Sequence, residues 1–249
     1  MPTAGKPRQL LALFALRAGS IVTVPTLVEE LWGENAPRSA ATTMQTYILQ
    51  LRRKINDALR ARPGTGPKDV LATCFGGYRL NSLSRPSDAA RFERMVTEGA
   101  TALETGDARQ ASAVLTRALG LWHGPALVDV PVGRILSMEV LALEEARARA
   151  LELRIEADLL LGRHTGLVGE LRVLTARQPL HEGYRAQLML ALYRSGHPWR
   201  ALEVFKELRT RLSEELGVEP SPRIQRLHRQ ILAGSPALEL PSSYEKFVV

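Results

Sequence analysis

The chain has 249 residues, of which 45% are hydrophobic and 24% charged, a balance typical of a globular protein of one or two domains. Its aromatic content of 5% is low for proteins that stack single-stranded bases on aromatic platforms. The single cysteine, Cys74, excludes an intrachain disulfide framework and a cysteine-based zinc site, and favours a cytoplasmic location. The short apolar run Leu10–Leu16, closed by Arg17, predicts an amphipathic helix instead of a signal peptide, and no stretch is long enough to span a membrane.

The net charge of +7 is unevenly distributed along the chain. Residues 1–84 hold 11 Lys/Arg and 5 Asp/Glu, whereas residues 85–249 hold 22 and 21. This asymmetry is what a nucleic-acid-binding module joined to a nearly neutral module would show. A generally arginine-rich chain with a chance imbalance is the alternative.

Three helices are predicted in the first 60 residues. The first covers residues 6–18, has an apolar face, and ends at Gly19. After a short extended link at Val22–Val24, Thr26 is expected to cap a second helix that ends at Trp32, with Glu29 completing a capping box. The third helix covers residues 39–59, with Ser39 as its expected cap.

The third helix is predicted to have two different faces. Met44, Ile48, Leu51 and Ile55 fall at i, i+4, i+7 and i+11, which forms one apolar stripe. The opposite face carries side chains that can bond to base edges in a major groove; they are Thr42, Thr43, Thr46, Gln50 and Arg53. Arg52, Arg53 and Lys54 add three consecutive positive charges. Taken alone, the same pattern also fits an ordinary surface helix with a basic end.

A β-hairpin is predicted after the third helix. Residues 60–69 are expected to be a linker, and the two β-prone runs Val70–Cys74 and Tyr78–Leu80 flank a Gly-Gly pair. Three helices followed by a hairpin is the layout of a winged helix-turn-helix, in which the third helix enters the major groove. The hairpin is then the wing, with Arg79 supplying charge near the DNA backbone.

The rest of the chain is predicted to be helical after a Ser/Pro-rich boundary at residues 81–88. The expected helices are 88–105, 108–122, 138–161, 165–177, 181–195, 198–216 and 221–233. Gly162 and Gly196 are 34 residues apart, and each separates two helices, which is typical of tetratricopeptide-like stacking. An unrelated helical bundle with glycine turns is the alternative. Residues 236–249 are expected to form a flexible tail.

The sequence offers no convincing catalytic or metal-binding motif. The five histidines have no i, i+4 metal spacing, and neither a nucleophile elbow nor a phosphate loop is present. The Trp122-His123-Gly124-Pro125 segment could line a small-molecule pocket, or close a helix and pack beneath the turn. No cofactor and no metal are therefore expected, and the chain is not expected to be an enzyme.

Three segments resemble the Streptomyces antibiotic regulatory protein family: APRSAATTMQTYILQLRRKI at 36–55, FGGYRL at 75–80 and EELGVEPSP at 214–222. The resemblance covers about residues 6–234. It implies a mainly α protein with a winged-helix DNA-binding domain, similar to the output domains of two-component response regulators. A tetratricopeptide-like bacterial transcriptional activation domain would follow. The expected limits are 1–84, 85–235 and a tail at 236–249, with the small N-terminal sheet of relatives short or missing here.

The resemblance also implies roles for individual residues. The recognition helix falls on residues 39–59, whose groove-facing residues would be Thr42, Thr43, Thr46, Gln50 and Arg53. The wing contacts would be Thr73, Gly77, Tyr78 and Arg79. We take Arg38, Arg52 and Lys54 as candidates for phosphate contacts.

The function implied by the resemblance is activation of a secondary-metabolite, or antibiotic, gene cluster. The expected partners are double-stranded DNA with direct repeats near the −35 region, and RNA polymerase holoenzyme with its sigma factor. Two copies would lie side by side on the DNA, without a membrane partner. The alternative is a helical-repeat adaptor or effector-binding regulator that does not read DNA directly.

Overall fold

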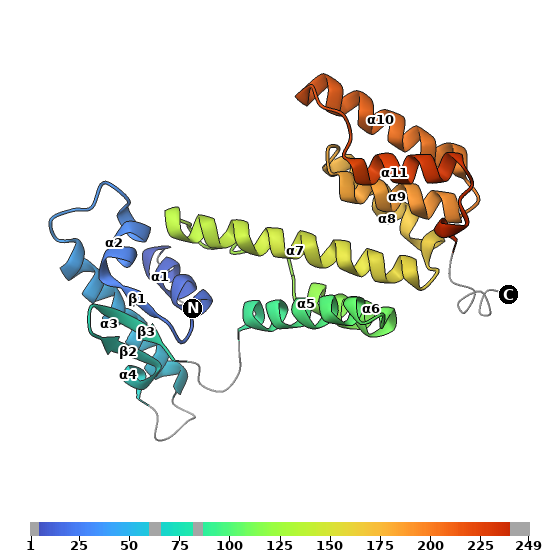
Figure 1. The fold of residues 1–249 in the computed structure, drawn as a ribbon. Coiled ribbons are helices and arrows are strands. Elements are labelled where there is room, and N and C mark those ends of the chain that lie inside the picture. The colour runs from blue at the N-terminus through green and yellow to red at the C-terminus, as the bar shows by residue number, and fades with distance from the viewer. Residues whose placement is uncertain (1–4, 60–65, 82–86, 240–249) are drawn as a thin grey trace. The chain divides into compact units, whose positions relative to one another are not determined.

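The computed structural model describes residues 5–59, 66–81 and 87–239 (Figure 1). It divides into two compact units, one made of Met1–Met95 with Ala118–Ala148 and the other of Val96–Arg117 with Arg149–Val249. The division runs through the helices α5 (Asp88–Glu104) and α7 (Arg134–Leu160). The expected module limits at residues 84 and 85 stay a prediction about which segments fold independently.

The first unit contains the predicted winged-helix elements. Its helices and strands are α1 (Gly5–Leu16), β1 (Ile21–Thr23), α2 (Val24–Trp32), α3 (Ala40–Leu59), α4 (Pro67–Val70), β2 (Leu71–Cys74) and β3 (Gly77–Leu80). The three strands form an antiparallel sheet in the order β1-β3-β2. The winged-helix prediction is therefore confirmed, with a third strand and a one-turn helix in addition to the predicted elements.

One apolar core joins the three helices to the sheet. Leu10 and Phe14 of α1, Leu27 of α2, Met44 of α3 and Leu71 of β2 belong to one cluster of buried side chains. The predicted stripe of α3 is confirmed, because Met44, Ile48 and Leu51 are buried and Ile55 is partly buried. Each helix contributes one face to this core, as an amphipathic helix on a globular surface does.

Strand β1 occupies the segment that the sequence predicted only as an extended link. Val22 lies opposite Tyr78 in the pairing with β3 and is buried, while its neighbours Ile21 and Thr23 are exposed. Thr23 then caps α2, since its Oγ1 accepts a hydrogen bond from the Thr26 backbone N–H at 3.4 Å. The predicted cap at Thr26 is therefore wrong by three residues, because the chain turns into the helix directly from the strand.

The beginning of α7 packs into the core of the first unit. Leu136 is fully buried in the same cluster as the winged-helix side chains. The Glu30 carboxylate, 2% exposed, accepts hydrogen bonds from the backbone N–H of Gly133 at 2.6 Å and of Leu136 at 2.8 Å. Gln9 also donates to Glu30 Oε1, at 2.6 Å. A buried carboxylate of α2 thus satisfies the unpaired amides at the start of α7 and complements the positive end of its dipole.

The second unit is helical, as predicted. Besides parts of α5, α7 and α6 (Ala108–Leu119), it contains α8 (His164–Arg177), α9 (Glu182–Arg194), α10 (Pro198–Leu216), α11 (Pro222–Leu232) and a short 3₁₀ helix, η1 (Pro236–Leu238). Helices α8–α11, together with the end of α7 and with η1, contribute to one apolar cluster that includes Leu171, Leu188, Phe205 and Ile224. The all-helical, tetratricopeptide-like arrangement predicted for this part of the chain is confirmed.

The helix pairs of the second unit share one type of turn. Gly106, Gly162 and Gly196 have φ values of +82°, +78° and +78°. After each glycine, the next residue's N–H bonds back to a carbonyl five residues earlier: Asp107 to Ala102, Arg163 to Asp158, and His197 to Leu192. This is the Schellman ending, which favours glycine because it requires a left-handed residue. The 34-residue glycine spacing in the sequence therefore reflects a repeated turn.

The described part of the expected tail is packed. Leu238 of η1 is buried in the apolar cluster of the second unit, and its carbonyl accepts a hydrogen bond from Arg194 Nε at 2.7 Å. The remainder of the predicted tail, residues 240–249, lies outside the described residues.

We predict that Glu30→Ala lowers the free energy of unfolding by about 2–4 kcal/mol, because it leaves two backbone amides without their acceptor and removes one of the two acceptors of the Gln9 amide. Urea unfolding followed by tryptophan fluorescence measures the change. The matched control is Glu29→Ala, which removes an exposed ion pair with Arg134 and should cost less than about 1 kcal/mol. Equal effects of the two substitutions would contradict the capping role of Glu30.

Candidate nucleic-acid interface

The outer face of α3 presents the predicted base-reading side chains to solvent. Thr42, Thr46, Gln50 and Arg53 are exposed, and Thr43 is half-buried. Because the buried stripe of the same helix is fixed in the core, the outer face has a single orientation relative to α1, α2 and the hairpin. The helix has 20 residues, and a rod of this kind is what a major groove accommodates.

Three basic side chains near the N-terminus bond to other parts of the first unit. Lys6 donates to the Leu31 carbonyl at 3.1 Å, Arg17 pairs with Glu139 at 2.7 Å, and Arg8 donates to the Asp129 carbonyl at 2.7 Å. Burial lowers the pKa of Lys6, which lies over the Trp32 ring at 4.4 Å. These three charges serve the fold.

Three other basic side chains, next to α3 or in it, are directed to solvent. Arg38, Arg53 and Lys54 are exposed, and none of them forms an ion pair with the residues that the structure describes. They lie just before α3 and in its C-terminal half. Positive charge that is available to an anionic partner therefore lies beside the helix whose outer face is polar.

Arg52 differs from its neighbours because its guanidinium bonds within the protein. Its Nε and Nη2 donate to the Leu71 carbonyl at 3.0 and 2.7 Å, and Nη2 also donates to Thr73 Oγ1 at 2.8 Å. The guanidinium lies 5.9 Å from the centre of the Tyr78 ring. Arg52 thus fastens α3 to the hairpin. Its direct contact with phosphate stays a prediction.

Of the predicted wing residues, two are accessible to solvent and two are buried. Thr73 is exposed and Arg79 is half-buried, with its Nε bonded to Asn81 Oδ1 at 2.9 Å. Gly77 and Tyr78 are buried, which gives them a packing role. A β-carbon at Gly77 would lie 2.3 Å from the Val22 carbonyl oxygen, so only glycine allows β3 to approach β1 this closely.

Two exposed apolar side chains were missed by sequence reasoning. Phe75, at the tip of the hairpin, is fully exposed, and Leu49, on the outer face of α3, is 51% exposed. Neither residue is among the predicted base-reading or wing residues. The helical spacing of Leu49 relative to Thr42 and Arg53 was the signal that could have found it.

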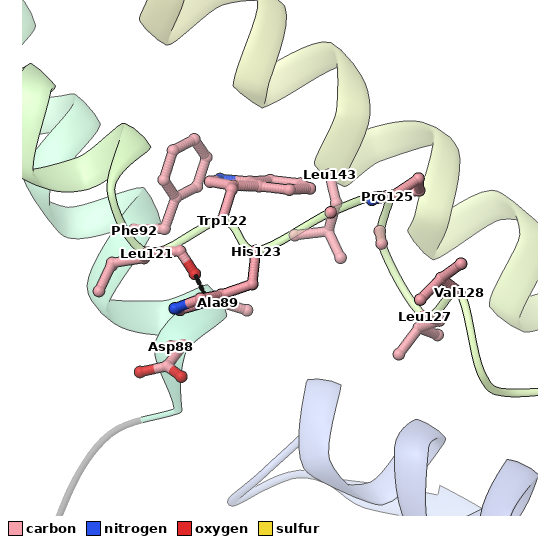
Figure 2. Close-up of a pocket in the computed structure, with 12 residues that line it drawn as sticks. Asp88, Ala89, Phe92, Leu121, Trp122, His123, Pro125, Leu127, Val128 and Leu143 are labelled. Carbon is pink, nitrogen blue, oxygen red and sulfur yellow. Dashed lines mark hydrogen bonds between the residues drawn. The ribbon is translucent and has the colours of Figure 1, made fainter.

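The Trp122–Pro125 segment lines a pocket of about 330 Å³ with Phe92 and Leu143 (Figure 2). The Trp122 ring meets Phe92 edge to face at 5.4 Å and lies under Arg147 at 4.7 Å. The segment thus packs against Phe92 of α5 and also borders a pocket, and small-molecule binding in that pocket stays a prediction.

Across residues 5–59, 66–81 and 87–239, no group of three or more His, Cys, Asp or Glu side chains could hold a metal ion. In those same ranges no helix combines the length and the apolar character that crossing a bilayer requires.

The winged helix-turn-helix with its basic outer helix defines a DNA-binding regulator of transcription. Comparison with known proteins leads to the same class of protein. A family model described as "Transcriptional regulatory protein, C terminal" matches residues 2–80, and one described as "Bacterial transcriptional activator domain" matches residues 87–232.

Individual relatives match over nearly the whole chain. The regulatory protein DnrI of Streptomyces peucetius is 52% identical over 238 residues, which cover 96% of this chain and 88% of that protein. The transcriptional regulator RedD of Streptomyces coelicolor is 38% identical, covering 96% and 67%. The solved structure of Mycobacterium tuberculosis EmbR in complex with a low affinity phosphopeptide is similar with a TM-score of 0.88 at 32% identity, over 95% of this chain and 61% of that chain.

The chain therefore belongs to the Streptomyces antibiotic regulatory protein family, whose winged-helix and bacterial transcriptional activator domains it contains in that order. It is a DNA-binding activator of transcription, of the kind that regulates antibiotic biosynthesis genes.

We predict that Gly77→Ala destabilises the sheet by about 1–3 kcal/mol, because the new methyl group would overlap the backbone of β1. A thermal melt followed by fluorescence measures the loss. Gly76→Asn is the control: Gly76 has φ +74° with nothing within 4 Å of an added β-carbon, and asparagine tolerates this conformation. A melt in which Gly77→Ala behaves like Gly76→Asn would contradict the close approach of β3 and β1.

Proposed function

We propose that this protein activates a secondary-metabolite gene cluster by reading direct repeats near the −35 region and holding RNA polymerase at the promoter. The observation that carries the proposal is the outer face of α3, which combines exposed polar side chains with Arg53 and Lys54 and is held beside a hairpin wing. The proposed contacts on this face are those of a recognition helix.

The outer face of α3 would read bases through a small number of side chains. Gln50 can form a bidentate pair with adenine N6 and N7, and Arg53 can pair with guanine O6 and N7. Thr42 and Thr43 offer hydroxyls to either kind of base. Each good contact of this type contributes roughly 1–3 kcal/mol of discrimination against the wrong base.

Phosphate contacts would supply the affinity that is independent of sequence. Arg38, just before α3, and Lys54, in its C-terminal half, are both exposed and could contact phosphates toward the two ends of the reading face. Each phosphate that a basic side chain neutralises releases condensed counterions, so binding weakens as salt rises. Arg52 would act mainly by keeping Thr73 and the wing in position beside α3.

The helical domain would act by proximity. Direct repeats imply two copies side by side on DNA, and a domain that contacts polymerase and its sigma factor raises their effective concentration at the promoter. No chemical step is required of the protein, so it is not proposed to be an enzyme. The protein would act in the cytoplasm, on nucleoid DNA.

We predict that Gln50→Ala and Lys54→Ala weaken promoter binding in different ways. Gln50→Ala should relax the base preference at one position of each repeat by about 1–3 kcal/mol. Lys54→Ala should weaken binding to all sequences and reduce the slope of log affinity against log salt by about 1. Footprinting and gel shifts on the upstream DNA of neighbouring genes, at several salt concentrations, measure both.

The same experiment has a clear contrary result. Identical effects of the two variants would contradict the division between base and phosphate contacts. A wild-type protein that protects no DNA sequence would contradict the proposal itself and favour the adaptor alternative.

A further inference from the structure

Leu49 is an apolar side chain at the centre of a polar helix face. It is 51% exposed and lies in the row Thr42, Thr46, Leu49, Arg53. This row has the same spacing as the buried row Met44, Ile48, Leu51, Ile55, displaced by two residues. Since two residues correspond to roughly 200° around an α-helix, the two rows lie on opposite sides of α3. Leu49 therefore lies on the outer face of α3 and would face the partner that binds there.

The position of Leu49 has no explanation within the fold. The apolar core of the first unit takes its α3 contribution from Met44, Ile48 and Leu51, with Tyr47 and Ile55 packed against them. Leu49 belongs to neither group. A single exposed leucine needs no explanation on an ordinary surface. Here it occupies the middle of the face proposed to enter a major groove.

Thr46, the neighbour of Leu49 in this row, restricts which bases the outer face of α3 can bind. Thr46 Oγ1 donates its hydrogen to the Thr42 carbonyl at 3.2 Å. In this state the hydroxyl can only accept, so its base partners are the amino groups of adenine or cytosine. An acceptor one turn from an apolar side chain suits an A·T pair, which presents an adenine amino group and a thymine methyl in the major groove.

We propose that Leu49 contacts the 5-methyl group of a thymine in each half of the binding site, and so contributes directly to base preference. This inference rests on the proposed function, because it assigns a specificity role within the same DNA-reading face. The methyl group is the feature by which thymine differs from uracil, and apolar contact with it is one of the ways proteins read the major groove.

The test uses the full chain and duplexes that carry its footprinted site. Each thymine of the site is replaced singly by deoxyuridine, which removes the methyl and keeps the base pair, and the affinity is measured by fluorescence anisotropy. The wild type should bind roughly fourfold more weakly when the contacted thymine is replaced, the equivalent of one buried methyl group. Leu49→Ala should bind with equal affinity to duplexes that carry thymine or deoxyuridine at that position. The two proteins and the two duplexes together form a double-mutant cycle.

The control variant is Ile21→Ala, which removes an apolar side chain of equal exposure, 50%, from β1 of the same unit. It should retain the thymine dependence of the wild type. Circular dichroism verifies that Leu49→Ala folds, as expected for an exposed position and a good helix former.

The possible failures are distinguishable. Specific binding by the wild type that tolerates deoxyuridine at every position overturns the role of Leu49 and leaves the proposed function intact. A thymine dependence that persists in Leu49→Ala also overturns the role of Leu49. So does a Leu49→Ala variant that binds DNA normally and fails only in transcription, a result that would favour contact of Leu49 with a protein partner. Absence of any specific binding overturns the proposed function as well.

Discussion

Burial of one stripe of α3 is the constraint on which the DNA-reading surface depends. Met44, Ile48 and Leu51 are held in a core built from α1, α2 and the sheet, so the helix cannot rotate about its axis without exposing them. The opposite row of side chains is therefore presented in one orientation. A reading helix needs this rigidity because its base contacts are short and directional. The core of this small unit thus supports specificity as well as stability.

The fold of the first unit also determines which of its basic side chains are available to bind DNA. Sequence composition counts every lysine and arginine equally, but Lys6, Arg8, Arg17 and Arg52 each bond to a carbonyl or carboxylate of the fold. Arg53 and Lys54 remain available beside the polar face. An overall positive charge attracts DNA from a distance, whereas the position of the uncommitted charges decides which face meets it.

The sequence predicted those parts of the structure that depend on local patterns. Apolar periodicity located α3 and its buried stripe, and the 34-residue glycine spacing located the repeated turns at Gly162 and Gly196. Features that join distant segments were not predictable. Strand β1 is three residues long and is defined by its pairing with β3. The burial of Glu30 follows from amides more than 100 residues away. The bonds from Arg52 to the Leu71 carbonyl likewise join residues that are 19 positions apart in the sequence.

The most direct test of the central claim is a chemical one: dimethyl sulfate protection of the bound promoter. The reagent methylates guanine N7, an atom of the major groove. If α3 lies in that groove, guanines within the footprint should be protected in clusters that repeat with the direct repeats, and Arg53→Ala should remove protection from one guanine in each cluster. A footprint in which guanine N7 stays fully reactive would show that the protein binds DNA by another surface, and would contradict the account.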